Sequence, residues 1–183
     1  MRITDAIRAD HQQLQSYYDQ ILHAPDEDEQ TRYQNQLVWE LARHIVGEDL
    51  VVYPALEQTT RDGARDRQTI KEQLAIFQDL HCSDPRFLPS MTLLMDQLAA
   101  HVHMEETVDL VKLEGAVTSE ESARLARSFG RTKHFVPTRA HPSAPDRPPY
   151  QTPVALLTAP LDSLQDLFRR WPESEFSPQP PME

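Results

Sequence analysis

The sequence is poor in cysteine and in long apolar runs. Its single cysteine, Cys82, cannot form an internal disulfide, which fits a reducing compartment. No apolar run approaches the length of a membrane-spanning helix, and the N-terminal residues MRITDAIRADHQQL lack the continuous apolar core of a signal peptide. These absences predict a cytoplasmic protein.

Basic residues are also scarce, since 18 Lys and Arg stand against 29 Asp and Glu, which gives a net charge of -11. An average surface of this sign repels nucleic acid and anionic membranes, so neither is expected as a partner. The chain has only four glycines and no Gly-rich phosphate loop. A protein partner is not identifiable from these features.

What the 183 residues do contain is a helical repeat of apolar side chains at alternating spacings of three and four. The spacing predicts helices at about 3–22, 29–58, 64–81 and 87–114. Gly63 and Gly115 are the expected stops, and Pro54 is expected to kink the second helix. Four amphipathic helices with short links predict an all-α, up-down-up-down four-helix bundle.

One stripe on each predicted helix is expected to face the core. The stripes are Ile3, Ile7, His11, Leu14, Tyr18 and Ile21; Tyr33, Leu37, Leu41, His44, Glu48 and Val51; Arg67, Ile70, Leu74, Phe77 and His81; and Met91, Leu94, Leu98, His101, Glu105 and Val108. Their polar members are the candidates for function.

The composition changes near the C-terminus, because eleven of the fifteen prolines lie from Pro137 onward. Before them, TSEE predicts a short fifth helix from Thr118 to about Gly130, opened by a capping box. An extended Pro-rich strap and a short amphipathic helix, PLDSLQDLFRRW, should follow, and the helix should dock by its apolar side. We therefore divide the chain into a bundle at 1–116 and a C-terminal segment at 117–183 packed on it. The apolar side of the PLDSLQDLFRRW helix consists of Leu161, Leu164, Leu167, Phe168 and Trp171.

Three His-Glu pairs in the sequence have a four-residue spacing. The pair at 23 and 27 spans Pro25 in an acidic loop and is the one match at this spacing that chance alone is expected to produce. The pairs at 44 and 48 and at 101 and 105 lie in register with apolar stripes, where a four-residue gap stacks both side chains about 6 Å apart on one helix face. Both members of each pair could reach one metal centre.

The level of the two pairs along the bundle is the same, and His11 on the first helix should lie at that level too. Three imidazoles and two carboxylates would then meet in the core, where an uncompensated charge costs several kcal/mol. The alternative is a set of partly solvated polar residues, or His-Glu pairs that only fix helix register. Ligands of these types suit iron, manganese or zinc, and carboxylates between facing helices favour a two-metal centre.

Three segments, DHQQL, HIVGEDLVVYPAL and HVHMEETVDL, make the chain resemble the hemerythrin HHE cation-binding family. That resemblance implies a four-helix bundle around a non-haem di-iron centre that binds oxygen or handles iron, oxygen or nitric oxide. It also implies that His11, His44 and His101 are terminal metal ligands and that Glu48 and Glu105 are bridging carboxylates.

The sequence departs from that family at Arg67, which occupies the position where the third helix normally supplies a histidine. Arginine stays protonated and cannot bind a metal ion. His81 is fourteen residues further along, about 21 Å at the rise of an α-helix, and cannot replace that ligand. The centre is therefore expected to be half degenerate, or else empty with Arg67 paired to Glu105 or Glu48 in place of a cation.

The function expected from these residues is iron binding with reversible binding of dioxygen or another small ligand. No signature of a substrate pocket is present, so an enzyme is the less favoured reading. A metal-free scaffold for protein-protein interaction is the alternative from a different functional class.

Overall fold

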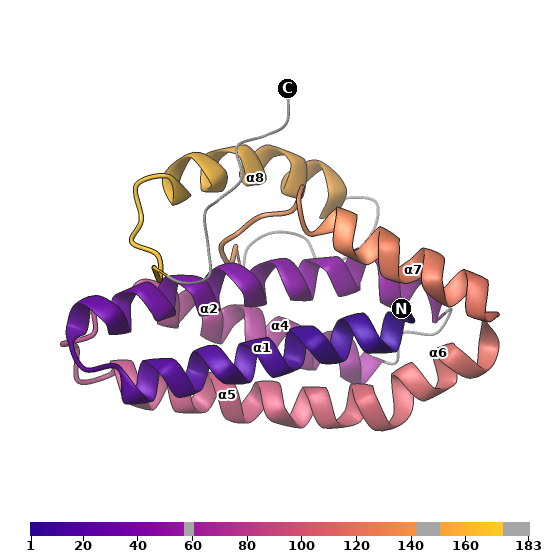
Figure 1. Cartoon of the computed structure of the whole chain (residues 1–183), viewed down its shortest axis with the longest axis horizontal. Helices are drawn as coiled ribbons and strands as arrows, with labels where there is room; N and C mark the ends of the chain where they lie inside the picture. The colour runs from indigo at the N-terminus through magenta and orange to yellow at the C-terminus, as the bar shows by residue number, and fades with distance from the viewer. Residues whose placement is uncertain (57–60, 142–150, 174–183) are drawn as a thin grey trace.

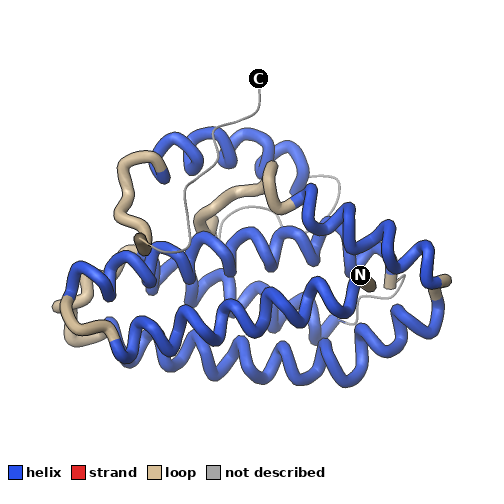
Figure 2. Tube along the Cα trace, viewed as in Figure 1, coloured by secondary structure: helices blue, strands red, loops and turns tan. Residues whose placement is uncertain are grey.

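The computed structural model describes residues 1–56, 61–141 and 151–173, which form helices and loops without a strand (Figures 1 and 2). Four long helices run up, down, up and down, as predicted (Figure 1). In this all-α bundle α1 packs on α2, and α4 packs on both α2 and α5. The bounds are α1 Ile3–His23, α2 Glu27–Gly47, α4 Arg61–Gln78 and α5 Phe87–Met104.

Side chains satisfy the free backbone groups at two of these helix ends. Asp26 precedes α2 and accepts a hydrogen bond from the Glu29 N–H, and acidic residues fill the first turn, where they favour the positive end of the helix dipole. At the far end of α4, the buried Gln34 amide donates to the carbonyl oxygens of Phe77 and Leu80. The short connections of the bundle are thus fixed by specific polar contacts.

A π-helical segment interrupts each of the two helices that carry the His-Glu pairs. In η1 (Glu48–Val52) the Tyr53 N–H donates to the Glu48 carbonyl, and in η2 (Glu105–Asp109) the Leu110 N–H donates to the Glu105 carbonyl. Each segment therefore begins at a predicted ligand. The helices continue as α3 (Tyr53–Ala55) and α6 (Leu110–Ala116).

The π-helical turns change the expected register, because each holds more residues than an α-helical turn. Beyond Glu105 the core residue is Leu110, whereas Val108 is only half-buried. Pro54 follows η1 directly, and because proline has no N–H it cannot donate to the carbonyl oxygen of Leu50 inside that segment. The expected stops differ too, since Gly63 lies inside α4 and Gly115 inside α6, and the predicted end at residue 58 lies outside the described residues.

Two apolar clusters fill the bundle, one on each side of the level of the predicted ligands. On α1, His11 lies between Ile7 of the smaller cluster and Leu14 of the larger one. Tyr17 is the buried tyrosine of this helix, while the predicted Tyr18 is half-buried. The level of the predicted ligands is therefore enclosed at both ends by apolar side chains.

The fifth helix, α7 (Ser119–Thr132), has the predicted capping box between Thr118 and Glu121. It packs across α1, α2 and η1. A Cβ on Gly47 would lie 2.8 Å from Cε2 of Phe129, closer than unbonded carbon atoms approach. At Gly47, α2 and α7 therefore lie too close for a side chain to fit between them unless Phe129 moves.

The structure corrects the expected docking of the last helix, α8 (Gln151–Asp166). Leu161, Leu164 and Leu167 are 57–63% exposed and Phe168 is 85% exposed. Among the α8 side chains that the structure describes, Ala159 and two aspartates, Asp162 and Asp166, are buried. Asp162 accepts a hydrogen bond from the backbone N–H of Thr138, and Asp166 accepts one from the Thr138 hydroxyl. Amphipathicity predicted the wrong side because the segment preceding α8 offers polar groups that need acceptors.

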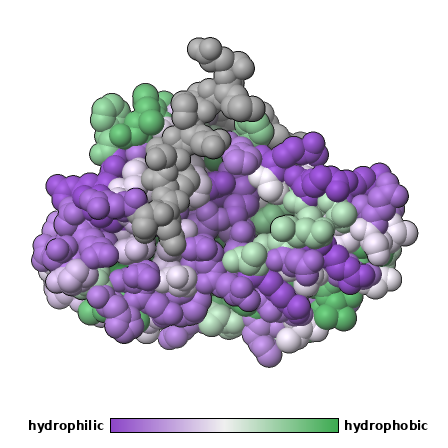
Figure 3. Space-filling model, viewed as in Figure 1, coloured by the Kyte–Doolittle hydropathy of each residue, from purple (hydrophilic) through white to green (hydrophobic). Residues whose placement is uncertain are grey.

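Apolar side chains gather at the edge of the molecule near α8 in the space-filling view, where polar residues cover most of the remaining face (Figure 3). Trp171, just beyond α8, does pack as expected, edge-on against Trp39 of α2. Residues 142–150, which hold most of the predicted strap, lie outside the described residues. In the described part of the chain, no helix combines the length and apolar character that crossing a membrane requires.

Candidate metal centre

Four of the five predicted ligands converge at one level of the bundle. His11 of α1, His44 of α2, and Glu48 and Glu105 at the starts of η1 and η2 each offer a ligand atom, and these atoms all lie within 4.8 Å of one another. All four side chains are buried. Such a group has the size of the coordination sphere of one ion.

The short distances inside the group join each histidine to a carboxylate. His44 Nε2 lies 2.7 Å from Glu48 Oε1, and His11 Nε2 lies 3.4 Å from Glu105 Oε2. The two imidazole rings are 5.0 Å apart at an interplanar angle of 72°. Both rings therefore present Nε2 to the carboxylates.

The fifth predicted ligand, His101, is near this group but not part of it. Its Nε2 lies 3.7 Å from Glu48 Oε2. The two oxygens of Glu48 thus face different histidines, with Oε1 toward His44 and Oε2 toward His101. The four candidate ligands thus form one group, and a second candidate metal position beside Glu48 Oε2 would have His101 as its histidine.

The donor atoms at this level fit a cation because the contacts they make among the described residues are with one another. Nε2 of all three histidines, both oxygens of Glu48 and Oε2 of Glu105 are buried without a hydrogen bond. A buried polar atom without a partner costs about 1–3 kcal/mol, and more when it carries charge. A metal ion would satisfy several of these atoms at once.

A carboxylate contacts Nδ1 of each histidine in the four-ligand group, on the opposite side of the ring from Nε2. His11 Nδ1 is 2.7 Å from Glu106 Oε1, and His44 Nδ1 is 3.1 Å from Asp10 Oδ2. In this arrangement Nδ1–H donates to the carboxylate and leaves the Nε2 lone pair for a metal ion. Neither carboxylate was identified from the sequence, although each directly adjoins a predicted ligand.

Lys133, which follows α7, completes the surroundings of His44. Its ammonium group contacts Asp10 at 2.5 Å and also contacts Glu40 of α2. Arg43 donates to the Lys133 carbonyl oxygen. The C-terminal segment therefore supplies a cation that balances the carboxylate holding a metal ligand.

In the metal-free cluster the pKa values favour a protonated His44 beside an ionised Glu48. Burial alone would lower the pKa of His44, but Glu48 and Asp10 raise it to about 10. Burial opposes ionisation of Glu48, yet His44 and His101 hold its pKa well below the ordinary value. Burial and the neighbouring Glu48 raise the pKa of Glu105. A divalent cation would replace the protons that this arrangement retains.

Arg67 does not form either of the two ion pairs that the sequence suggested. Its Nε donates to Asp49 Oδ1 at 2.7 Å, and Lys71, one turn further along α4, contacts the other Asp49 oxygen at 2.6 Å. The Arg67 guanidinium lies on the ring of Tyr53, and the Tyr53 hydroxyl donates to Glu105 Oε1 at 3.2 Å. Arg67 thus reaches the cluster through Tyr53.

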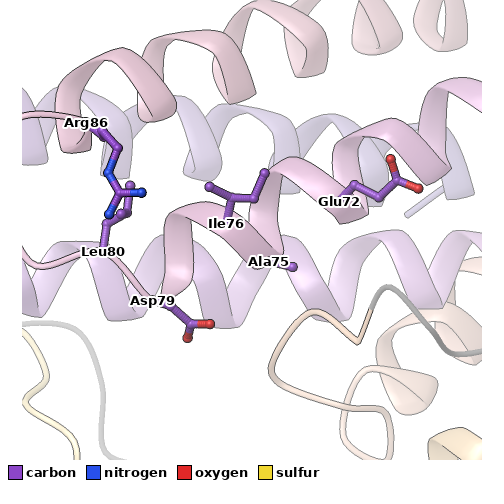
Figure 4. Close-up of a pocket in the computed structure, with 6 residues that line it drawn as sticks. All are labelled: Glu72, Ala75, Ile76, Asp79, Leu80 and Arg86. Carbon is purple, nitrogen blue, oxygen red and sulfur yellow. The ribbon is translucent and has the colours of Figure 1, made fainter.

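Other polar features lie away from this centre. His81 and His103 are exposed, as expected of residues without a ligand role. A surface pocket lies along the second half of α4 and the turn that follows it (Figure 4). Its lining includes Leu80, which is buried in the larger apolar cluster. Its six lining residues include no member of the metal cluster: Glu72, Ala75, Ile76, Asp79, Leu80 and Arg86.

A four-helix bundle with buried histidines and carboxylates at one level defines a helical protein with a candidate metal centre. The model of the hemerythrin HHE cation-binding domain matches residues 2–122, and the chain belongs to this family. It is 45% identical over 179 residues to an uncharacterized hemerythrin-like protein of Schizosaccharomyces pombe, covering 93% of this chain and 88% of that one.

A second relative is more distant. A DNA nickase of Nostoc is 24% identical over 144 residues, which is 76% of this chain and 41% of that protein. No solved structure is significantly similar to the chain. The S. pombe relative covers almost the whole chain, whereas the family model ends before α7 does.

Proposed function

We propose that this protein binds a single iron ion through His11, His44, Glu48 and Glu105 and uses it to bind dioxygen or another small ligand. The observation that carries the proposal is the convergence of these four donors within 4.8 Å, each buried. Two histidines with carboxylates form the donor set that non-haem ferrous proteins use. The π-helical turns that start at both glutamates support it, since such turns are frequent at functional sites.

Bound iron would supply an open coordination position for a small ligand, because roughly six positions are available and four protein residues are offered. The chain's own residues would hold the ion, orient the two imidazoles and exclude bulk water. Glu106 and Asp10 keep the imidazole protons on Nδ1, and the two apolar clusters enclose the site. Binding and sensing are favoured over catalysis because the cluster adjoins no described pocket for an organic substrate.

DNA nicking is not proposed for this chain. The match covers only 41% of the Nostoc nickase, and a net charge of -11 repels DNA phosphates. The family to which the chain belongs is described as a cation-binding domain, which favours a metal site instead.

The test is iron content per chain after anaerobic loading with ferrous iron and desalting, with Arg67→His measured beside the native protein. We expect about one iron in the native chain and more in the variant, because a histidine on α4 would add a ligand near His101. His44→Ala is the matched loss-of-ligand control and should retain little iron. Loading should also raise the melting temperature of the native protein, since iron would bind only the folded state.

Failure of both readouts has a definite meaning. A native chain that retains no iron and shows no rise in melting temperature would favour the metal-free scaffold. Iron retention without an oxygen-dependent change in absorption would remove dioxygen as the ligand and leave the metal site in place.

A further inference from the structure

We propose that Lys133 is a positioning residue for the candidate metal centre, where it favours ferrous over ferric iron by acting on His44 through Asp10. The inference rests on the proposed function, because it concerns the oxidation state of the iron held by the four ligands. Lys133 directly follows α7 and lies beyond residue 122, where the match to the hemerythrin model ends. A residue from outside the matched domain would thus belong to the site.

The first observation is that one carboxylate oxygen of Asp10 has two partners. Oδ2 lies 3.1 Å from His44 Nδ1 and accepts a hydrogen bond from Lys133 Nζ at 2.5 Å. A carboxylate that accepts the Nδ1 hydrogen of a metal-bound imidazole makes the ring a stronger donor to the metal. A cation bonded to the same oxygen lowers the affinity of that oxygen for a proton. Lys133 therefore limits how strongly Asp10 acts on His44.

The second observation is that His11, the other histidine of the group, lacks this arrangement. Its Nδ1 lies 2.7 Å from Glu106 Oε1, whereas Arg8 binds the other oxygen, Oε2, at 3.2 Å. The Arg8 side chain is 49% exposed, compared with 10% for Lys133. Only the carboxylate oxygen at His44 is thus shared with a buried cation.

The third observation is that the ammonium group of Lys133 is held in place. Nζ also contacts the carboxylate of Glu40 and lies 5.5 Å from the centre of the Phe129 ring. Its side chain passes α2 at Gly47, where an added Cβ would lie 3.4 Å from Lys133 Cγ. The side chain therefore cannot turn to solvent without leaving two buried carboxylates.

Two effects of Lys133 on bound iron have the same sign. A buried positive charge disfavours the ferric ion, which carries one more charge than the ferrous ion. A weaker pull of Asp10 on the His44 proton also leaves the imidazole a weaker donor, which disfavours the ferric ion again. Lys133 should therefore raise the reduction potential of the site.

The experiment is a potentiometric titration of the iron-loaded protein, in which each ferric ion takes one electron from a reduced mediator dye and becomes ferrous. Lys133→Met removes the charge and keeps an unbranched side chain. We expect the ratio of ferric to ferrous iron at a given potential to rise about tenfold or more, which is a fall of about 59 mV in reduction potential. Lys133→Arg keeps the charge and should lie nearer the native value.

Two further variants separate this role from a general effect of charge. Arg8→Met removes the cation from the carboxylate at His11, and the potential should fall by less, because Arg8 is exposed and binds the other oxygen. Glu40→Gln frees Lys133 from its second carboxylate and should raise the potential. This change in the opposite direction decides the question if Lys133→Met does not fold, and a value at or below the native one would then overturn the inference.

A double variant tests whether Lys133 acts through Asp10. In an Asp10→Asn background, Lys133→Met should shift the potential less than it does in the native background. Equal shifts in both backgrounds would overturn the positioning role, as would a native potential in Lys133→Met with native iron content. A native protein that retains no iron would instead contradict the proposed function.

Discussion

His44 illustrates at the scale of one residue how the fold orients a proposed metal ligand through both ring nitrogens. Nε2 faces Glu48 Oε1, and Nδ1 is held by Asp10, which is itself held by Lys133. Three elements of the chain thus determine the orientation of a single imidazole. The ring also meets Phe129 of α7 edge-on, with 6.0 Å between ring centres.

Asp10 should therefore contribute to metal affinity without touching the metal. Asp10→Asn removes the charge that makes the His44 imidazole a stronger ligand, and we expect metal affinity to fall about 10- to 100-fold. The measurement is competition for iron or zinc with a chelating indicator. Asp19→Asn, an exposed change on the same helix, is the control and should leave the affinity unaltered. Native affinity in Asp10→Asn would show that the contact with His44 is only structural.

Sequence spacing predicted the positions of His11, His44, Glu48 and Glu105, because a four-residue gap and a shared bundle level follow from helix geometry alone. Asp10, Glu106 and Lys133 could not be found in this way. Their role depends on side-chain reach between helices, which periodicity does not describe. The pairing of Arg67 with Asp49 was missed for the same reason, although its buried position was expected.

At the scale of elements, α2 differs from the other bundle helices because it is buried on two sides. One side faces the bundle core, and the other lies under α7 and the segment that follows it. The second side carries polar residues such as Glu40 and Arg43, both buried and both in contact with Lys133. The sequence predicted a single stripe because buried charged residues look like a solvated surface until the covering segment is placed.

The contact between α2 and α7 at Gly47 gives a prediction that opposes helix propensity. Gly47→Ala would gain up to about 1 kcal/mol from propensity, but its Cβ would meet the ring of Phe129. Overpacking of this kind costs about 1–3 kcal/mol, so we expect a net loss of stability. Gly130→Ala on α7 has open space around the new Cβ and should stabilise instead. Urea unfolding of both variants measures the difference.

A smaller ring neighbour should relieve the cost of the alanine. The double variant Gly47→Ala with Phe129→Leu should be less destabilised than the sum of the two single changes predicts. Simple additivity would contradict the close approach of the two helices.

The π-helical turns at Glu48 and Glu105 were also beyond sequence analysis. An apolar stripe predicts which face is buried, but an extra residue in one turn depends on how the neighbouring helices pack. The same limit explains the expected burial of Val108 in place of Leu110. The existence and order of the helices were predictable, and their interruptions were not.

At the scale of the whole molecule, α7 packs on the bundle through apolar side chains such as Phe129, whereas the chain beyond it is attached largely through polar contacts. Arg32 and Asn35 of α2 donate to carbonyl oxygens of Trp171 and Arg170. His141 Nε2 lies 2.9 Å from Asp162 Oδ2 and ties α8 to the segment after α7. Attachment of this kind depends on protonation more than an apolar interface would.

Stability should therefore depend on pH through His141. The hydrogen bond to Asp162 raises the pKa of His141 above its usual value of 6.5, against the smaller effect of burial. A raised folded-state pKa means that the contribution is complete below about pH 6.5 and is lost as the pH rises through the folded value. The difference in unfolding free energy between native protein and His141→Gln should be larger at about pH 6 than at about pH 9. An equal difference at both values would exclude a charged pair.

The two-sided burial of α2 has a consequence for synthesis on the ribosome. All four residues proposed to hold the metal ion have been made by residue 105, well before the segment that covers the outer side of α2 has emerged. A nascent bundle must expose that side for the time needed to add the remaining residues, and exposed apolar surface at this stage promotes aggregation. Because Glu40 and Arg43 lie on that side, the unfinished chain exposes charged groups that water solvates well, which lowers the risk of aggregation until the C-terminal segment has been made.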